Sequence, residues 1–196
     1  MDIFFVSLGC DKNLVDSENM LGLLKEHGYN ITDIEEEADI IIVNTCCFIN
    51  DAKEESIQTI LEMAQYKKHG NLKALIVTGC LAQRYKDEIL KEIPEVDALI
   101  GTTAFTEIIT VIDEVMKGKK STYFSDINTL PANQSKRILS AGSYYSYLKI
   151  AEGCNKHCTY CIIPKVRGNY RSKPLNELIE EASYLASLGV KELILV

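Results

Sequence analysis

Short apolar runs alternate with longer stretches of mixed polarity along the first 120 residues. The runs at 3–8, 40–43, 74–77 and 98–100 predict buried parallel strands, since strands covered on both faces read as continuous apolar runs. Between them, residues 13–27, 51–69, 83–93 and 105–117 carry apolar positions at helical spacing. This alternation predicts an α/β fold in which residues 1–124 form a domain around an open parallel sheet.

A polar stretch without periodicity, residues 125–142, is interpreted as a linker. Beyond it the pattern predicts a strand at 144–152, a loop at 154–173, a helix at 174–188 and a strand at 191–196. This order opens a (β/α) barrel, and a complete barrel needs about 200 residues or more. We therefore expect residues 143–196 to be the first part of a second domain, inside which the chain is truncated.

The composition is that of an ordinary globular chain, with 196 residues, a net charge of −7 and 46% hydrophobic residues. There is neither an apolar run of membrane-spanning length nor a signal peptide, so we expect a cytoplasmic protein with no membrane partner. Seven cysteines in a reducing compartment favour metal or redox chemistry over disulfides. Residues 1–125 have a net charge of −10 and the remainder +3. The acidic part is either a solvated surface or a surface that repels nucleic acid or attracts a basic partner.

Three cysteines follow the carboxyl ends of predicted strands: Cys10 in VSLGC, Cys46 in VNTC and Cys80 in VTGC. Ligand sites in open α/β sheets lie at that edge, so we expect the three thiols to meet there. Three thiolates suit a metal or an iron–sulfur cluster with one open iron. The alternative is that they are small buried hydrophobes. Cys47 is one step out of register and is expected to point away.

A second cysteine motif, C-x3-C-x2-C, follows the first predicted strand of the second domain. It consists of Cys154, Cys158 and Cys161. The spacing also fits one helix face, but Gly153 before it and Pro164 after it favour a loop. A zinc-binding interaction module with His157 as the fourth ligand is the non-enzymatic alternative.

The second motif, with Tyr160 before its last cysteine, resembles the radical S-adenosylmethionine signature. The resemblance implies that its three thiolates hold three irons of a [4Fe–4S] cluster, and that the fourth iron binds S-adenosylmethionine, with Tyr160 in the same cofactor site. An electron from such a cluster cleaves S-adenosylmethionine to give a 5′-deoxyadenosyl radical.

A three-cysteine α/β domain followed by a radical S-adenosylmethionine barrel resembles the methylthiotransferases, over the whole chain. The resemblance implies an enzyme that transfers a sulfur group, with an auxiliary [4Fe–4S] cluster on Cys10, Cys46 and Cys80 that supplies or carries the sulfur. One S-adenosylmethionine would methylate this sulfur, and a second would generate the radical that takes hydrogen from the substrate carbon.

The segments SLGCDKNLVDSENM, NTCCFINDAKEESI and CIIPKVRGNYRSK are similar to the branch that modifies the β-carbon of an aspartate in ribosomal protein S12. The branch that modifies adenosine 37 of tRNA is the alternative. Asp11 stands where many members have proline and Cys47 where many have glycine, and neither change removes a ligand. The RNA-binding domain that usually ends these enzymes is absent from the chain. The sequence identifies neither the sulfur source nor the electron donor.

Several polar residues near the two motifs have open roles. Lys165, Arg167 and Arg171 form a basic run that is either a solvated loop or a contact for an anionic substrate or the ribosome. Asn13 is interpreted as the cap of the first helix, with a place near the auxiliary cluster as the alternative.

Overall fold

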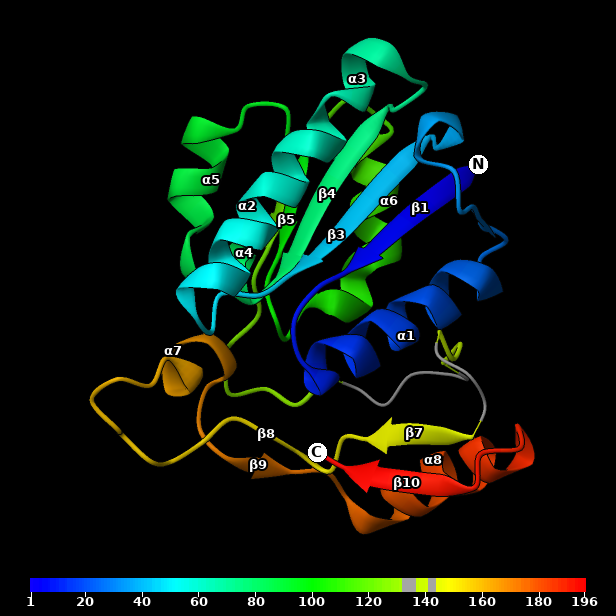
Figure 1. The fold of residues 1–196 in the computed structure, drawn as a ribbon, viewed down its shortest axis with the longest axis vertical. Coiled ribbons are helices and arrows are strands. Elements are labelled where there is room, and N and C mark those ends of the chain that lie inside the picture. Colours follow the sequence, from blue (N-terminus) through cyan, green and yellow to red (C-terminus); the bar gives the residue numbers. More distant parts are fainter. Residues whose placement is uncertain (132–136, 141–143) are drawn as a thin grey trace.

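The computed structural model describes residues 1–131, 137–140 and 144–196. A six-stranded sheet, in the order β2-β1-β3-β4-β5-β6, forms its larger part, and every neighbouring pair is parallel (Figure 1). The strands are β1 (Asp2–Ser7), β2 (Asn30–Ile31), β3 (Ile40–Thr45), β4 (Ala74–Gly79), β5 (Ala98–Ile100) and β6 (Ser121–Tyr123). The predicted α/β fold with an open parallel sheet is confirmed, and the short edge strands β2 and β6 are additions to it.

Helices cover both faces of this sheet (Figure 1). One face carries α1 (Asp11–Glu26), the 3-10 turn η2 (Phe105–Glu107) and α6 (Ile108–Val115). The other carries α2 (Asn50–Ala64), α4 (Cys80–Arg84) and α5 (Lys86–Glu92), while α3 (Tyr66–His69) continues from α2 and η1 (Glu35–Glu37) precedes β3. The helices predicted at 51–69 and 83–93 are thus each broken into two.

The two central strands are buried at every position, which explains why they read as continuous apolar runs. In β3, Ile41 and Val43 pack under α2, whereas Ile40 and Ile42 pack under α1 and α6. Burial of one such side chain contributes about 1.5–3 kcal/mol. The two cores together fix the strand register and therefore the position of the turns that follow the strands.

The second part of the chain forms a smaller unit beside the sheet. Its strands β7 (Tyr145–Leu148) and β10 (Glu192–Leu195) are parallel and are connected through α8 (Leu175–Ser187). Between them lie β8 (Ala151–Glu152), α7 (Ile163–Arg167) and β9 (Arg171–Ser172), and β8 and β9 pair antiparallel. The strand–helix–strand order is as predicted, but the predicted loop contains α7 and β9, and Pro164 lies in the first turn of α7.

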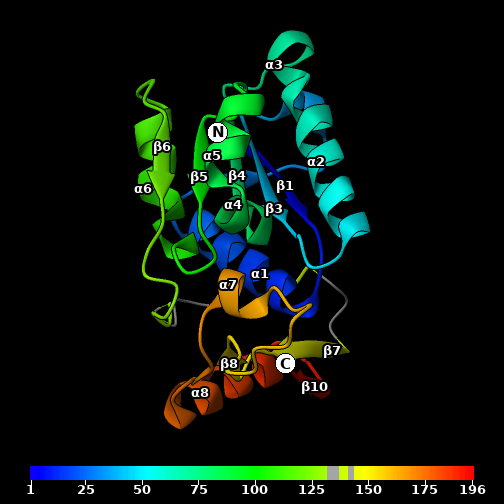
Figure 2. The ribbon, with the colours of Figure 1, turned by 90° about the vertical axis from the view of Figure 1, so that its left-hand side faces the viewer.

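Helix α1 lies between the sheet and this second unit, and α7 packs near α4 at the end of the sheet (Figures 1 and 2). The predicted linker falls partly on residues 132–136 and 141–143, which lie outside the described residues. Its described part contacts α1: Ile138 N donates to Glu18 O at 3.1 Å, and Ser140 N donates to the Glu18 carboxylate at 3.0 Å. Among the helices that the structure describes, none is long and apolar enough to cross a membrane.

Candidate metal centre

Three of the seven cysteines lie at one edge of the sheet. Ser7 of β1 pairs with Asn44 of β3, and Asn44 pairs with Thr78 of β4, so the carboxyl ends of these strands are level. The turns that follow bring Cys10, Cys46 and Cys80 to a single cavity of about 360 Å³. Its other lining residues are Asp11, Lys12, Phe48, Gly153, Ile162, Ile163, Val166, Arg167 and Val196. The structure therefore brings the three cysteines together as the strand pattern predicts.

The turn before Cys10 depends on a glycine. Gly9 has φ +94°, a conformation that side chains other than glycine rarely adopt. A Cβ atom added there would lie 2.5 Å from Cβ of Cys46 and 2.9 Å from its Sγ. Only glycine lets the chain pass this close to Cys46.

Cys47 does not line this cavity. Its side chain is buried in the core under α2, and its Sγ donates to the carbonyl of Cys80 at 3.2 Å. Ser56 of α2 fixes the preceding residue, because its Oγ accepts from Cys46 N at 3.0 Å and donates to Cys46 O at 2.9 Å. The side chains of Cys46 and Cys47 thus have different surroundings, with only Cys46 facing the cavity.

The three thiols of the cavity differ in exposure. Cys10 is exposed, while Cys46 and Cys80 are buried. Burial raises the pKa of the Cys80 thiol to about 12, although the nearby Arg167 guanidinium acts in the opposite direction. Cys80 is therefore a neutral thiol at pH 7, and metal binding would have to release its proton.

Three thiols around one cavity form a donor set that an iron–sulfur cluster can use. A cluster takes each thiolate on a different iron, so thiols spread around a cavity suit it. The apolar walls from Ile162, Ile163 and Val166 would also limit the access of water.

The C-x3-C-x2-C segment is a loop, not a helix, as predicted. Cys154 and Cys161 are half-buried and Cys158 is exposed. Cys154 N donates to Gly168 O at 3.0 Å, and Cys161 N donates to Cys158 O at 3.0 Å. Tyr160 is 89% exposed, and His157 is exposed as well. These three cysteines do not line the first cavity, although Gly153 and Ile162, the sequence neighbours of Cys154 and Cys161, do.

Asn13 has a different place from the one expected of a helix cap. Helix α1 begins at Asp11 with Cys10 as its N-cap, so Asn13 lies inside the helix. Its Nδ2 donates to Leu8 O at 3.0 Å and to Thr45 O at 2.9 Å. Its Oδ1 faces the Cys80 thiol at 3.8 Å. The cap interpretation is wrong, and the structure places Asn13 at the cavity edge.

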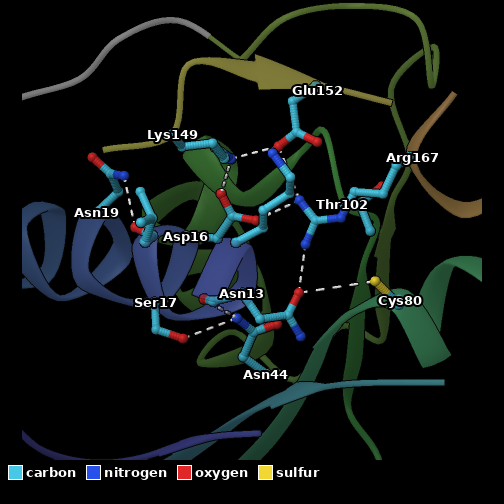
Figure 3. A network of polar contacts seen from close by, with 12 residues as sticks. Asn13, Asp16, Ser17, Asn19, Asn44, Cys80, Thr102, Lys149, Glu152 and Arg167 are labelled. Atoms are coloured by element: carbon cyan, nitrogen blue, oxygen red, sulfur yellow. Dashed lines mark hydrogen bonds and ion pairs between the residues drawn. The ribbon is translucent and has the colours of Figure 1, made fainter. Parts of the chain in front are cut away.

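Arg167 is buried, and the interpretation of the basic run as a solvated loop is wrong for it. Its Nη1 lies 2.8 Å from Asp16 Oδ2 and 2.9 Å from Glu152 Oε1 (Figure 3). Lys165 is exposed, and Arg171 donates to the Arg167 carbonyl at 3.2 Å.

Lys149 completes this buried group of charges by pairing with Asp16 and Glu152 (Figure 3). The sequence analysis missed the role of these residues. One signal was present: Lys149 interrupts the apolar run YLKIA, and a charge in a buried strand needs a partner of opposite sign.

Comparison with known proteins gives two family matches. Residues 2–101 match the family described as "Uncharacterized protein family UPF0004", and residues 148–196 match the "Radical SAM superfamily". Similar curated proteins carry the name "Ribosomal protein uS12 methylthiotransferase RimO". That of Lachnoclostridium phytofermentans is 65% identical over the whole chain, that of Thermoanaerobacter sp. 53% over the whole chain, and that of Acetivibrio thermocellus 56% over 97% of it. The chain spans 44% of the length of each of these relatives. A radical SAM segment implies S-adenosylmethionine and iron–sulfur chemistry.

Proposed function

This chain belongs to the UPF0004 family, and because its residues 148–196 also match the radical SAM superfamily, we propose that it is part of a methylthiotransferase. The proposed reaction adds a methylthio group to the β-carbon of an aspartate in ribosomal protein S12. The observation that carries this proposal is the convergence of Cys10, Cys46 and Cys80 on one cavity in a chain that also has C-x3-C-x2-C.

The proposal assigns one [4Fe–4S] cluster to each cysteine set. Cys10, Cys46 and Cys80 would hold the auxiliary cluster, and Cys154, Cys158 and Cys161 would hold the radical cluster, with Tyr160 beside S-adenosylmethionine. The clusters would supply the electron and the sulfur site. The chain's own residues position the thiols: Gly9 permits the close turn, and Ile162 and Val166 cover the cavity.

The S12 substrate is supported by the names of the relatives and by charge. Residues 1–125 carry a net charge of −10, and S12 is basic, so the first domain would attract this substrate and repel RNA. A ribosomal-protein substrate would be met in the cytoplasm.

The proposed domains are 1–124, which carries the auxiliary site, and 143–196, which begins the radical domain, joined by 125–142. The family matches at 2–101 and 148–196 support this division. The hydrogen bonds from Ile138 and Ser140 to Glu18 indicate that residues 137–140 of the joining segment are attached to helix α1 of the first domain.

Iron and sulfide content after anaerobic reconstitution tests the cofactor assignment. Wild type should bind about eight irons, and each triple alanine variant, Cys10/Cys46/Cys80 or Cys154/Cys158/Cys161, about four. About four irons in wild type, lost only with the second triple, would leave a radical enzyme without an auxiliary cluster. Zinc in place of iron would contradict the assignment of both sites.

The substrate is tested separately with the full-length protein. It is incubated with S-adenosylmethionine, a reductant and either an S12 peptide or a tRNA anticodon stem. Methylthiolation of the peptide alone is the expected result. Modification of the tRNA alone would overturn the choice of substrate and leave the cofactor assignment standing.

A further inference from the structure

The polar face of α1 is buried, which is unusual for charged residues of a surface helix. Asp16 is 4% exposed and Glu18 is 3% exposed. Each carboxylate meets cations from beyond residue 130: Asp16 meets Lys149 and Arg167, and Glu18 meets Arg137. The two parts of the chain therefore meet across charged side chains.

The group around Asp16 is compact and electrically balanced. Asp16 and Glu152 alternate with Lys149 and Arg167, so that each acid contacts both bases (Figure 3). Each of the four charged groups has two partners of opposite sign within the group, and each therefore depends on the others.

This group lies between the two cysteine sets. Glu152 precedes Cys154 by two residues, and the carbonyl of Gly168, next to Arg167, accepts the hydrogen bond from Cys154 N. On the other side, Arg167 Nη2 donates to Asn13 Oδ1, the atom that faces the Cys80 thiol. The Arg167 guanidinium therefore connects the backbone segment that holds Cys154 to the side chains around Cys80.

Two further contacts hold the same segments together. Lys12 Nζ donates to Ala151 O at 2.8 Å, and Thr102 Oγ1 donates to Val166 O at 2.7 Å. A buried ion network contributes little net stability compared with apolar packing, but it demands one geometry, because any other arrangement leaves a buried charge without a partner.

We propose that Asp16, Lys149, Glu152 and Arg167 form an interdomain clamp, in which Arg167 is the positioning residue that fixes the two cysteine sets relative to each other. The clamp itself is a property of the fold. Its purpose rests on the proposed function, because a reaction that uses two clusters needs them at a constant separation.

The test uses the full-length protein with both clusters oxidised and spin labels at two exposed positions, Glu55 of α2 and Glu180 of α8. Pulsed electron paramagnetic resonance then measures the distance between the domains. Arg167→Met should at least double the width of the distance distribution. Arg167→Lys, which keeps the charge, should give a width between those of wild type and Arg167→Met. Lys165→Met, on the same helix but exposed, is the matched control and should match wild type.

A second readout distinguishes positioning from damage to the fold. In Arg167→Met the methylthiolated peptide formed per 5′-deoxyadenosine, measured on protein with the full wild-type iron content, should fall by about 10-fold to 100-fold. If Arg167→Met does not fold, Asp16→Asn, which removes one acid of two, is measured in its place.

A distance distribution as narrow as that of wild type in both Arg167→Met and Asp16→Asn would overturn the clamp. If wild type itself forms no methylthiolated product, the proposed function fails, but the distance measurement still decides whether the clamp exists.

Discussion

The guanidinium of Arg167 donates a hydrogen bond to Oδ1 of Asn13, although the two residues are 154 positions apart in the sequence. Asn13 in turn donates to the carbonyl of Leu8, which directly follows β1, and to that of Thr45, the last residue of β3. One amide side chain therefore joins two strand ends of the first domain to a helix of the second.

Replacement of Asn13 by leucine should lower the free energy of unfolding by about 2 kcal/mol, because one buried and one half-buried carbonyl lose a donor. Asn19→Leu is the control, since the Asn19 side chain donates to Val15 O within its own helix and joins no strands. Urea denaturation measures both. Equal losses in the two variants would show that the bridge between the strands contributes nothing specific.

Cys46 and Cys47 should differ sharply when each is changed to alanine. Cys46→Ala removes a thiol from the cavity and should abolish iron binding at the first site. Cys47→Ala removes a sulfur that is buried in the core and donates to the Cys80 carbonyl, so the variant should keep its iron and lose about 1 kcal/mol of stability. Iron analysis and thermal denaturation check this pair. Iron loss in Cys47→Ala with retention in Cys46→Ala would reverse the assignment.

A methyl group at Gly9 should disrupt the turn that carries Cys10. Gly9→Ala combines a strained backbone with a collision against Cys46, and we expect a loss of about 3 kcal/mol or more together with reduced iron binding. Gly28→Ala has a similar φ of +80° but no atom within 4 Å of the added Cβ, so it should cost only about 1 kcal/mol. Similar losses of unfolding free energy in both variants would mean that backbone strain alone, and not the collision with Cys46, determines the effect.

Asp39 should make the stability of the sheet depend on pH. Its carboxylate accepts from Lys73 Nζ at 2.7 Å and from Asp2 N at 3.0 Å, and these contacts hold the pKa of Asp39 below its ordinary value. Because the folded pKa is the lower one, the contribution is present at neutral pH and is lost as pH falls below about 4. The free energies of unfolding of wild type and Asp39→Asn should differ by about 1 kcal/mol or less at pH 7, and this difference should disappear near pH 3. The exposed Asp33→Asn is the control, and a gap that widens in acid would contradict the assignment.

The sheet and its cysteine edge were predictable because local patterns determine them. The apolar runs at β3 and β4 record burial on both faces, and the period of a strand places Cys46 and Cys80 at equivalent positions after them. The resemblance to the radical S-adenosylmethionine methylthiotransferases, drawn from short cysteine motifs, is confirmed by the family matches and by the names of the relatives.

The remaining features depend on contacts between distant segments. The two residues of β2 and the three of β6 carry too little pattern to predict strands. Pro164 reads as a helix breaker, yet proline is tolerated in the first turn, where α7 has it. The burial of Asp16 and Glu18 could not be predicted, because nothing in the local sequence reveals that a second unit covers them.

Cys46 and Cys80 are buried in a cavity that Val166 and Ile162 also line, whereas Cys10 in the same cavity is exposed. A thiol reagent can therefore reach Cys10 directly, but it reaches the other two only when the residues around them move apart. At high reagent concentration the labelling rate of the buried pair would become independent of concentration and equal to the opening rate. The labelling rate of these two cysteines would thus report how often the cavity opens, with Cys10 as the internal reference.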